Sequence, residues 1–302
     1  MVGVSVIIPT YRREAPLRRC LADVLAQRHP AFEVLVVDQS AEHEAATWAA
    51  LRALPPHAHH VRLAQPSVTA AVNVGARLAK APLLLFLDDD VQIREPDLLA
   101  RHARHYDDPT IAGVVGRIVN ADGRGERPRP AAGGQLAFLD MNFDHPHAMD
   151  VPTAAGANMS FRRHIVERLG GFDERYTGNA FRWETDFSLR VTRAGLRIRY
   201  DPEARVVHHY GTPGGCDNAH LLARTEASHA WYAPFFRNNT YFALKLLAGG
   251  DRARFFWRLY REHVLNRAFL LAGPAFLARR HAALVRGAAG GWRAWRAARA
   301  DA

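Results

Sequence analysis

Short apolar runs alternate with helix-like segments through the first hundred residues, and this alternation constrains the fold more than any other feature of the sequence. Apolar runs are typical of buried strands, which we expect at 4–9, 32–37 and 83–87, with a shorter one at 61–64. Between the strands, helices are expected at 17–25, 41–54 and 68–80. This order predicts a Rossmann-like α/β fold, with a mixed, mostly parallel sheet and helices on both faces.

Polar residues directly follow three of these expected strands. Thr10-Tyr11 follows the first strand, Asp38 the second, and Asp88-Asp89-Asp90 the run at 83–87. Because open α/β sheets bind ligands at the carboxyl ends of their strands, we expect these side chains to lie near one ligand site.

The second half of the chain is less regular, and we divide it near residue 220. Before that point we expect a loop at 120–134, a strand at 156–161, helices at 162–169 and 185–194, strands at 196–200 and 205–208, and a glycine-rich loop at 211–218. Beyond it the periodicity is helical. The expected domains are therefore 1–220, an α/β catalytic domain, and 221–302, a basic and aromatic-rich helical extension.

The net charge of +10 is concentrated in this extension. Residues 251–302 hold eleven arginines and three acids, which leaves about +2 for the first 250 residues. Arginines interspersed with aromatic side chains such as Phe255, Phe256, Trp257 and Tyr260 suit an anionic membrane surface. The alternative is a helical subdomain whose aromatic side chains pack on the catalytic core.

Three further features of the sequence bear on localisation. The N-terminus has no basic segment of a signal peptide, and the apolar run at 268–278 is too short to span a bilayer. The two cysteines form no disulfide or zinc pattern. We therefore expect a cytoplasmic protein that is peripheral on the cytoplasmic face of the membrane.

The acidic triplet is the strongest local indication of chemistry. Asp88 and Asp90 can point to the same side because side chains alternate along an extended chain. Carboxylate oxygens suit Mg²⁺ or Mn²⁺, and such an ion could hold a diphosphate. The alternative is a solvated acidic turn that caps the next helix.

Four other positions could serve a ligand or a reaction, each with a structural alternative. Asp38 could bind a ribose or base, or could cap a helix. Glu184 or Asp186, at a helix start, could act as a general base or complement the helix dipole. One histidine of the His208-His209 pair could bind a metal ion or be structural. His57, His59 and His60 resemble a surface cluster, and we assign them no role.

Many blocks together resemble family 2 glycosyltransferases of the GT-A fold, in order and in spacing, over residues 4–215. The blocks are VSVIIPTYRR (4–13), VVDQS (36–40), the helix with Asn73, FLDDDV (86–91), GANMSFRR (156–163), GGFDER (170–175), ETDFSLRVTRAG (184–195) and DPEARVVHH (201–209).

The resemblance implies a role for particular residues. The nucleotide pocket would be lined by Pro9, Thr10, Tyr11 and Asp38, and Asn73 and Asp89 would also contact the nucleotide sugar. Asp88 would contact the ribose or the metal ion, Asp90 would bind the metal ion, and His208 would help to hold it. Gly156 and Asn158 would lie near the donor sugar and the acceptor, and Glu184 would be the catalytic base.

The sequence departs from the family pattern at three points. Gln39 follows Asp38 where the family often has a second aspartate, and Val72 stands where the helix before Asn73 often has an arginine. Trp183 replaces one carboxylate of the acidic pair, which leaves Glu184 as the base and Asp186 as the second candidate.

These observations predict an inverting, metal-dependent glycosyltransferase. It would use a nucleotide-diphosphate sugar and a saccharide or lipid-linked acceptor. We expect loops at 120–150 and 211–218 to determine the specificity for these substrates. The turn after the first strand lacks the glycines of a dinucleotide-binding dehydrogenase or a sugar nucleotidyltransferase. A non-catalytic scaffold, binding nucleotide or membrane, is the alternative; we expect no nucleic-acid partner, because such binding would leave the acidic strand ends unexplained.

Overall fold

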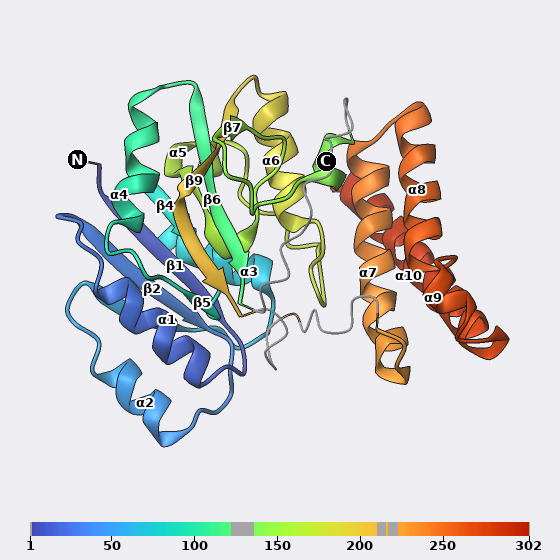
Figure 1. The fold of residues 1–302 in the computed structure, drawn as a ribbon, viewed down its shortest axis with the longest axis horizontal. Coiled ribbons are helices and arrows are strands. Elements are labelled where there is room, and N and C mark those ends of the chain that lie inside the picture. The colour runs from blue at the N-terminus through green and yellow to red at the C-terminus, as the bar shows by residue number, and fades with distance from the viewer. Residues whose placement is uncertain (1, 122–135, 210–215, 217–222, 302) are drawn as a thin grey trace.

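The computed structural model describes residues 2–121, 136–209, 216 and 223–301 (Figure 1). Most of the two expected loops, at 120–134 and 211–218, lies outside these residues. So does the expected domain boundary at 220.

A nine-stranded mixed sheet forms the centre of the described α/β part, as the sequence predicts. Its spatial order is β3-β2-β1-β4-β8-β6-β9-β5, with β7 paired to β9. The strands are β1 (Val4–Thr10), β2 (Phe32–Asp38), β3 (Ala58–Arg62), β4 (Leu83–Phe86), β5 (Val91–Gln92), β6 (Ile111–Asn120), β7 (Met149–Asp150), β8 (Met159–Arg162) and β9 (Arg197–His208). Strands β1 to β4 are parallel, and β8 is antiparallel to both of its neighbours.

Helices cover both faces of the sheet. Successive side chains of a strand point to opposite faces, and those on both faces are apolar. In β1, Val4, Val6 and Ile8 share a core with α1 (Ala15–Leu25), α2 (Ala45–Arg52) and α4 (Leu98–Ala103). Ile7 packs on the other face, in a core with α3 (Val68–Leu78), α5 (Arg163–Arg168) and α6 (Trp183–Arg193). Short 3₁₀ turns lie at Arg104–Asp107, Ala137–Asp140 and Gly156–Asn158.

The structure corrects several expected elements. The strands expected at 196–200 and 205–208 are one strand, β9. Its pairing with β6 passes from Asp201 directly to Arg205, so the three residues between them form an irregularity within the strand. The segment expected as a strand from residue 156 begins with a 3₁₀ turn. Strand β6 was not expected, because its glycines interrupt the apolar run. A Cβ at Gly113 would lie 2.6 Å or less from two atoms of the Phe161 ring, so close packing requires glycine there.

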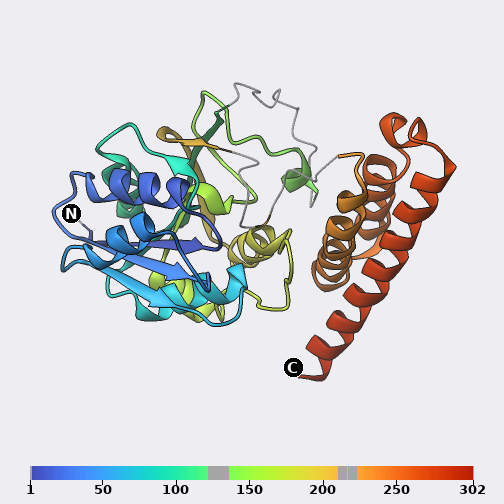
Figure 2. The same cartoon turned by 90° about the horizontal axis from the view of Figure 1, so that it is seen from below.

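Helices make up the described residues beyond 223. They are α7 (Glu226–Leu246), α8 (Gly249–His263), α9 (Arg267–Leu270) and α10 (Pro274–Ala300). Figure 1 and Figure 2 show α7, α8 and α10 side by side next to the α/β part. Helices α7 and α10 run in the same direction, since Arg280 contacts Ser228 and Gly291 lies against Thr240.

This helical extension packs on the α/β part through its aromatic side chains. Phe235, Phe242 and Phe255 are buried in the same core as Tyr176 and Trp183, which belong to the α/β part. The aromatic Phe255, proposed from the sequence to face a membrane, is therefore a core residue. No helix among the residues that the structure describes has the length and hydropathy to cross a bilayer.

Two adjacent glycines of α10 predict opposite effects on stability. A Cβ at Gly291 would lie 2.7 Å from Thr240 Cβ and 2.9 Å from the Tyr241 nitrogen, whereas a Cβ at Gly290 would lie 3.5 Å from Arg237 Cγ. Helix propensity alone favours alanine by about 1 kcal/mol at either position. We expect Gly291→Ala to lower the free energy of unfolding by about 1–3 kcal/mol through overpacking, and Gly290→Ala to raise it. Urea denaturation of both variants checks this; equal effects would contradict the close contact between α7 and α10.

Candidate active site

A cavity of about 1130 Å³ lies at the carboxyl ends of β1, β4 and β9. The start of α6, the turn at Ala137–Asp140 and Trp231 of α7 form its other walls. Among the residues predicted from the sequence, those that line it are Pro9, Thr10, Tyr11, Asp88, Asp89, Asp90, Glu184 and His208. The remaining predicted residues, Asp38, Asn73, Gly156, Asn158 and Asp186, are not part of its lining.

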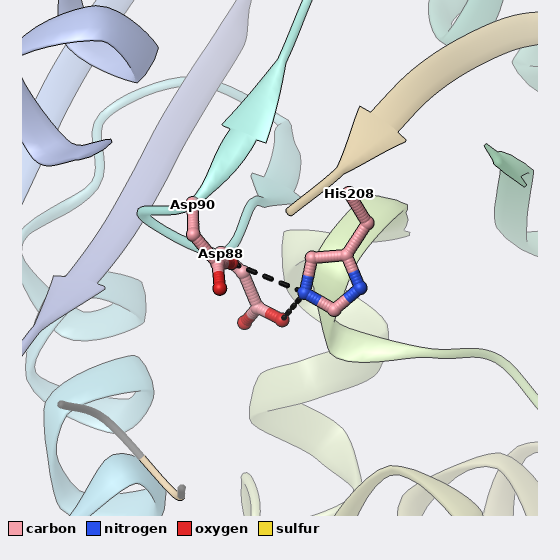
Figure 3. Close-up of side chains that lie close together, drawn as sticks. All are labelled: Asp88, Asp90 and His208. Carbon is pink, nitrogen blue, oxygen red and sulfur yellow. Dashed lines mark ion pairs between the residues drawn. The ribbon is translucent and has the colours of Figure 1, made fainter. Parts of the chain in front are cut away.

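Three potential metal ligands meet in this cavity (Figure 3). The Nε2 atom of His208 lies 3.1 Å from Asp90 Oδ1 and 3.8 Å from Asp88 Oδ2, and one ligand atom from each residue falls within 4.8 Å of the others. Strand pairing explains the arrangement: β5 follows the acidic triplet and places Val91 opposite His208 at the end of β9. The backbone N–H of His209 also donates to the carbonyl of Asp90.

The donor set of this cluster fits a divalent cation. Two carboxylates and one imidazole suit Mn²⁺ or Mg²⁺. Ligand oxygens at about 2.1 Å from such an ion lie about 3–4 Å apart, close to the spacing found here. Burial would raise the pKa of Asp90, but the hydrogen bond with His208 and the charges of His208 and Arg13 lower it to about 2. Asp90 is thus an ionised carboxylate at neutral pH.

Arg13 also lines the cavity, although no sequence pattern identified it as a site residue. It forms ion pairs with Asp90 and with Asp89, the latter at 3.4 Å. Asp89 also accepts a hydrogen bond of 2.6 Å from the Thr10 hydroxyl. Burial raises the pKa of Asp89 to about 7, although Arg13 opposes that shift. Arg13 comes just after β1, and the neighbouring strand β4 is followed by three acids. This position is the feature that could have identified it.

Glu184 lies in the first turn of α6 and lines the cavity. Its Oε1 accepts a hydrogen bond of 3.4 Å from the Gly156 N–H. A Cβ at Gly156 would lie 2.9 Å from the Trp183 ring and 3.3 Å from Glu184 Oε1, so glycine leaves room for both side chains. Burial, with a smaller contribution from the charge of Asp88, raises the pKa of Glu184 to about 7. A carboxylate with this pKa can accept a proton near neutral pH.

Asp186 lies on the opposite side of α6 from Glu184, because two helical residues are about 200° apart around the axis. It is fully buried and pairs with Lys245 at 2.7 Å and Arg190 at 2.8 Å. The Tyr176 hydroxyl donates to it at 2.9 Å. Since Lys245 belongs to α7, Asp186 links α6 to the helical extension.

Asp38 is also fully buried, and two histidines contact its carboxylate. His43 Nε2 lies 3.1 Å and His60 Nε2 2.9 Å from Asp38 Oδ2, while the Ser40 N–H donates to Oδ1. Burial would raise the pKa of Asp38, but the hydrogen bonds from His60 and Ser40 lower it to about 2. His60, which has no role predicted from the sequence, thus holds Asp38, whose neighbour Gln39 lines the cavity.

The two predicted asparagines make buried hydrogen bonds outside the cavity. Asn73 Nδ2 donates to the Phe172 carbonyl and to Glu174, each at 2.8 Å. Asn158 Nδ2 donates to the Ala204 carbonyl at 2.7 Å, and its Oδ1 lies 2.9 Å from His102 Nε2. These contacts hold neighbouring backbone segments together.

The mixed sheet, with a cluster of carboxylates and an imidazole at the carboxyl ends of its strands, places this fold in the class of GT-A-type α/β proteins. Residues 5–170 match the sequence model of glycosyl transferase family 2, and the chain belongs to this family. The fold is similar to a mannosyltransferase from Pyrobaculum calidifontis solved in complex with GDP-Man and Mn²⁺, with a TM-score of 0.58 and 22% identity over 96% of this chain and 76% of that one.

Two curated relatives show a similarity of the same extent. An O-antigen biosynthesis protein of Myxococcus xanthus is 28% identical over 222 residues, which are 68% of this chain and 17% of the relative. A pre-mycofactocin glycosyltransferase of Mycobacterium tuberculosis is 30% identical over 217 residues, which are 69% of this chain and 43% of the relative. The match thus spans less than half the length of either relative.

Proposed function

We propose that this chain is an inverting, divalent-cation-dependent glycosyltransferase. It moves a sugar from a nucleotide-diphosphate donor to a hydroxyl of a saccharide or lipid-linked acceptor. The observation that carries the proposal is the joint placement of Asp88, Asp90, His208 and Glu184 on the wall of one cavity. The mannosyltransferase with the similar fold was solved with GDP-Man and Mn²⁺, a donor and cation of the proposed classes.

Each residue then has a defined task. Asp88, Asp90 and His208 would hold the cation, and a bound cation supplies stabilisation of the charge that develops on the leaving diphosphate. Glu184 takes the proton of the acceptor hydroxyl as its oxygen attacks the anomeric carbon. One base and one displacement invert the anomeric configuration. Pro9, Thr10 and Tyr11 line the cavity beside the acidic triplet and would contact the nucleotide.

A scaffold that binds nucleotide or membrane without catalysis is the alternative function. Such a protein has no need of a carboxylate poised to accept a proton. The raised pKa of Glu184, beside the acidic cluster, favours the enzyme.

A donor panel tests the proposal directly. Nucleotide sugars are added to the full chain with Mn²⁺ or with EDTA, and thermal unfolding is recorded. At a concentration a hundredfold above its Kd, we expect one donor to raise the Tm by roughly 5 °C when Mn²⁺ is present but not when EDTA is present. NMR of the glycoside formed from that donor should then show an inverted configuration at the anomeric carbon. Retention at that centre would contradict the single displacement, and no stabilisation by any donor would contradict the transferase.

We propose further that the protein is cytoplasmic and contacts the anionic face of the membrane through the corner around α9. Leu270 and Leu271 are 49% and 73% exposed there. The charged residues of 267–279 are Arg267 and Arg279, with no acid. Exposed leucines flanked by arginines suit insertion into an anionic interface.

The double variant Leu270→Ser/Leu271→Ser is expected to bind vesicles that contain phosphatidylglycerol at least roughly tenfold more weakly than the wild type, because two leucines leave the interface. Vesicle flotation of the full chain measures this. Val285→Ser is the control, since Val285 is 66% exposed on α10 outside the corner. Equal flotation of the double variant and the wild type would remove the membrane proposal.

A further inference from the structure

Arg182 is a charged residue of the cavity wall that the proposed mechanism leaves without a task. It immediately precedes α6, and its backbone φ of 83° is in the left-handed region that disfavours arginine. Its guanidinium lies 5.1 to 5.8 Å from the ring centroids of Phe138, Phe181 and Phe255. Its Nε donates to Asn239 Oδ1 at 3.1 Å. Helices α7 and α8 therefore help to fix this side chain in the wall.

The charge of Arg182 has no ion-pair partner among the residues that the structure describes. The nearby acid Asp140 pairs instead with Arg258, at 2.7 Å. Of the five N–H donors of the Arg182 guanidinium, the one on Nε has a hydrogen-bond acceptor within the described parts of the chain. Burial lowers the pKa of Arg182 to about 10, and the guanidinium still remains charged at neutral pH.

A cation that has no ion pair within the described residues is costly in this half-buried position, although the charge of Glu184 partly offsets the cost. Charges withdrawn from water are normally paired, and the positive φ of Arg182 adds backbone strain. The partial positive charge at the start of α6 adds repulsion. An anion in the cavity would relieve both electrostatic costs at once and would satisfy the remaining donors.

We propose that Arg182 binds an oxyanion, a phosphate or a carboxylate, carried by the acceptor substrate. This proposal rests on the transferase function above. The Cα atoms of Arg182 and Glu184 are at most about 7 Å apart, since only one residue, Trp183, lies between them. An acceptor anchored at Arg182 would thus present a nearby hydroxyl to Glu184.

The size of the cavity and the composition of its walls support an acceptor subsite. At about 1130 Å³ it exceeds the volume of about 300–1000 Å³ that is usual for one small ligand. The donor diphosphate belongs with the cation ligands Asp88, Asp90 and His208. Arg182 lies instead with the aromatic side chains Phe138 and Phe181, which can pack on a sugar ring or an apolar chain.

Anion binding without metal tests the proposal. Calorimetry in EDTA compares glucose 1-phosphate, glucuronate and glucose as probes of the full chain and of Arg182→Asn. Asparagine tolerates the left-handed backbone and removes the charge. We expect the two anions to bind the wild type more tightly than glucose, and Arg182→Asn to lose their affinity by roughly tenfold or more. Arg77→Asn, on the exposed side of α3, is the control and should bind like the wild type.

The outcomes are distinct. Tighter binding of glucose 1-phosphate assigns a phosphorylated acceptor, and tighter binding of glucuronate assigns an acidic sugar. Equal binding of all three probes to the wild type, or unchanged anion binding in Arg182→Asn, would overturn the proposal. Arg182→Asn should also unfold at no lower temperature than the wild type, and Arg182→Lys, which keeps the charge but not the planar fork, should bind with intermediate affinity.

A second measurement separates this proposal from the transferase function. Binding of UDP and GDP with Mn²⁺ should be the same for Arg182→Asn and the wild type. Weaker nucleotide binding in the variant would place Arg182 on the donor and overturn the acceptor assignment. Absence of nucleotide binding in the wild type would instead contradict the transferase function and leave the EDTA result to be judged on its own.

Discussion

Replacing Glu184 by Gln is expected to lower kcat for sugar transfer by about 10²- to 10⁴-fold, because a general base contributes about that much. The amide cannot accept the proton of the acceptor hydroxyl, yet it keeps the size and the Gly156 contact of the carboxylate. Donor affinity should therefore be unchanged. Steady-state kinetics with the donor identified in the panel, together with donor binding by calorimetry, checks both parts.

The pH dependence gives the same prediction a second readout. Because burial raises the pKa of Glu184 to about 7, the ionised base becomes more abundant as pH rises through this value, and the rate should rise with it. This rise should be absent from the residual activity of Glu184→Gln. Glu167→Gln, an exposed glutamate of α5, is the matched control and should keep the wild-type profile. Full activity in Glu184→Gln would exclude Glu184 as the base.

The second large effect is expected for Asp90→Asn. Asp90 is the carboxylate that contacts both His208 and Arg13, and its replacement removes an ionised ligand from the proposed cation site. We expect transfer to fall by a factor on the order of 10³, since charge stabilisation at the leaving group is lost. Donor binding should also weaken, in contrast to Glu184→Gln.

Kinetics in a Mn²⁺ titration checks this prediction. Asp97→Asn, at the start of α4, is the control for loss of one carboxylate and should leave the rate unaltered. Asp90→Asn with the wild-type rate and the wild-type Mn²⁺ dependence would show that the cluster has no part in catalysis.

The strand ends were predictable from the sequence because their chemistry is local. An apolar run fixes a strand, the next residue lies at its carboxyl end, and parallel pairing brings Thr10 and the acidic triplet to one edge. The same reasoning, with the family resemblance, selected His208, which the structure places beside Asp90. The α/β fold and the helical extension follow from periodicity in the same way.

Contacts between distant segments were not predictable by these rules. Asp186 and Glu184 are equivalent as residue types at a helix start, and the side chain that distinguishes them, Lys245, lies about 60 residues later in α7. Likewise Asp38 lies at the carboxyl end of β2, close to where it was expected, but His43 and His60 come from outside that strand and contact its carboxylate. Arg182 gave no sequence pattern, because what distinguishes it is the lack of an ion pair among the described residues, which only the folded structure shows.

The central claim is that Asp88, Asp90 and His208 hold a divalent cation on which a nucleoside diphosphate binds. Calorimetric titration of UDP and GDP into the wild type and His208→Ala, each with Mn²⁺ and with EDTA, tests it most directly. We expect Mn²⁺ to strengthen binding of at least one nucleotide by roughly tenfold or more in the wild type, and His208→Ala to lose most of this gain. Equal affinity with Mn²⁺ and with EDTA in the wild type would contradict it.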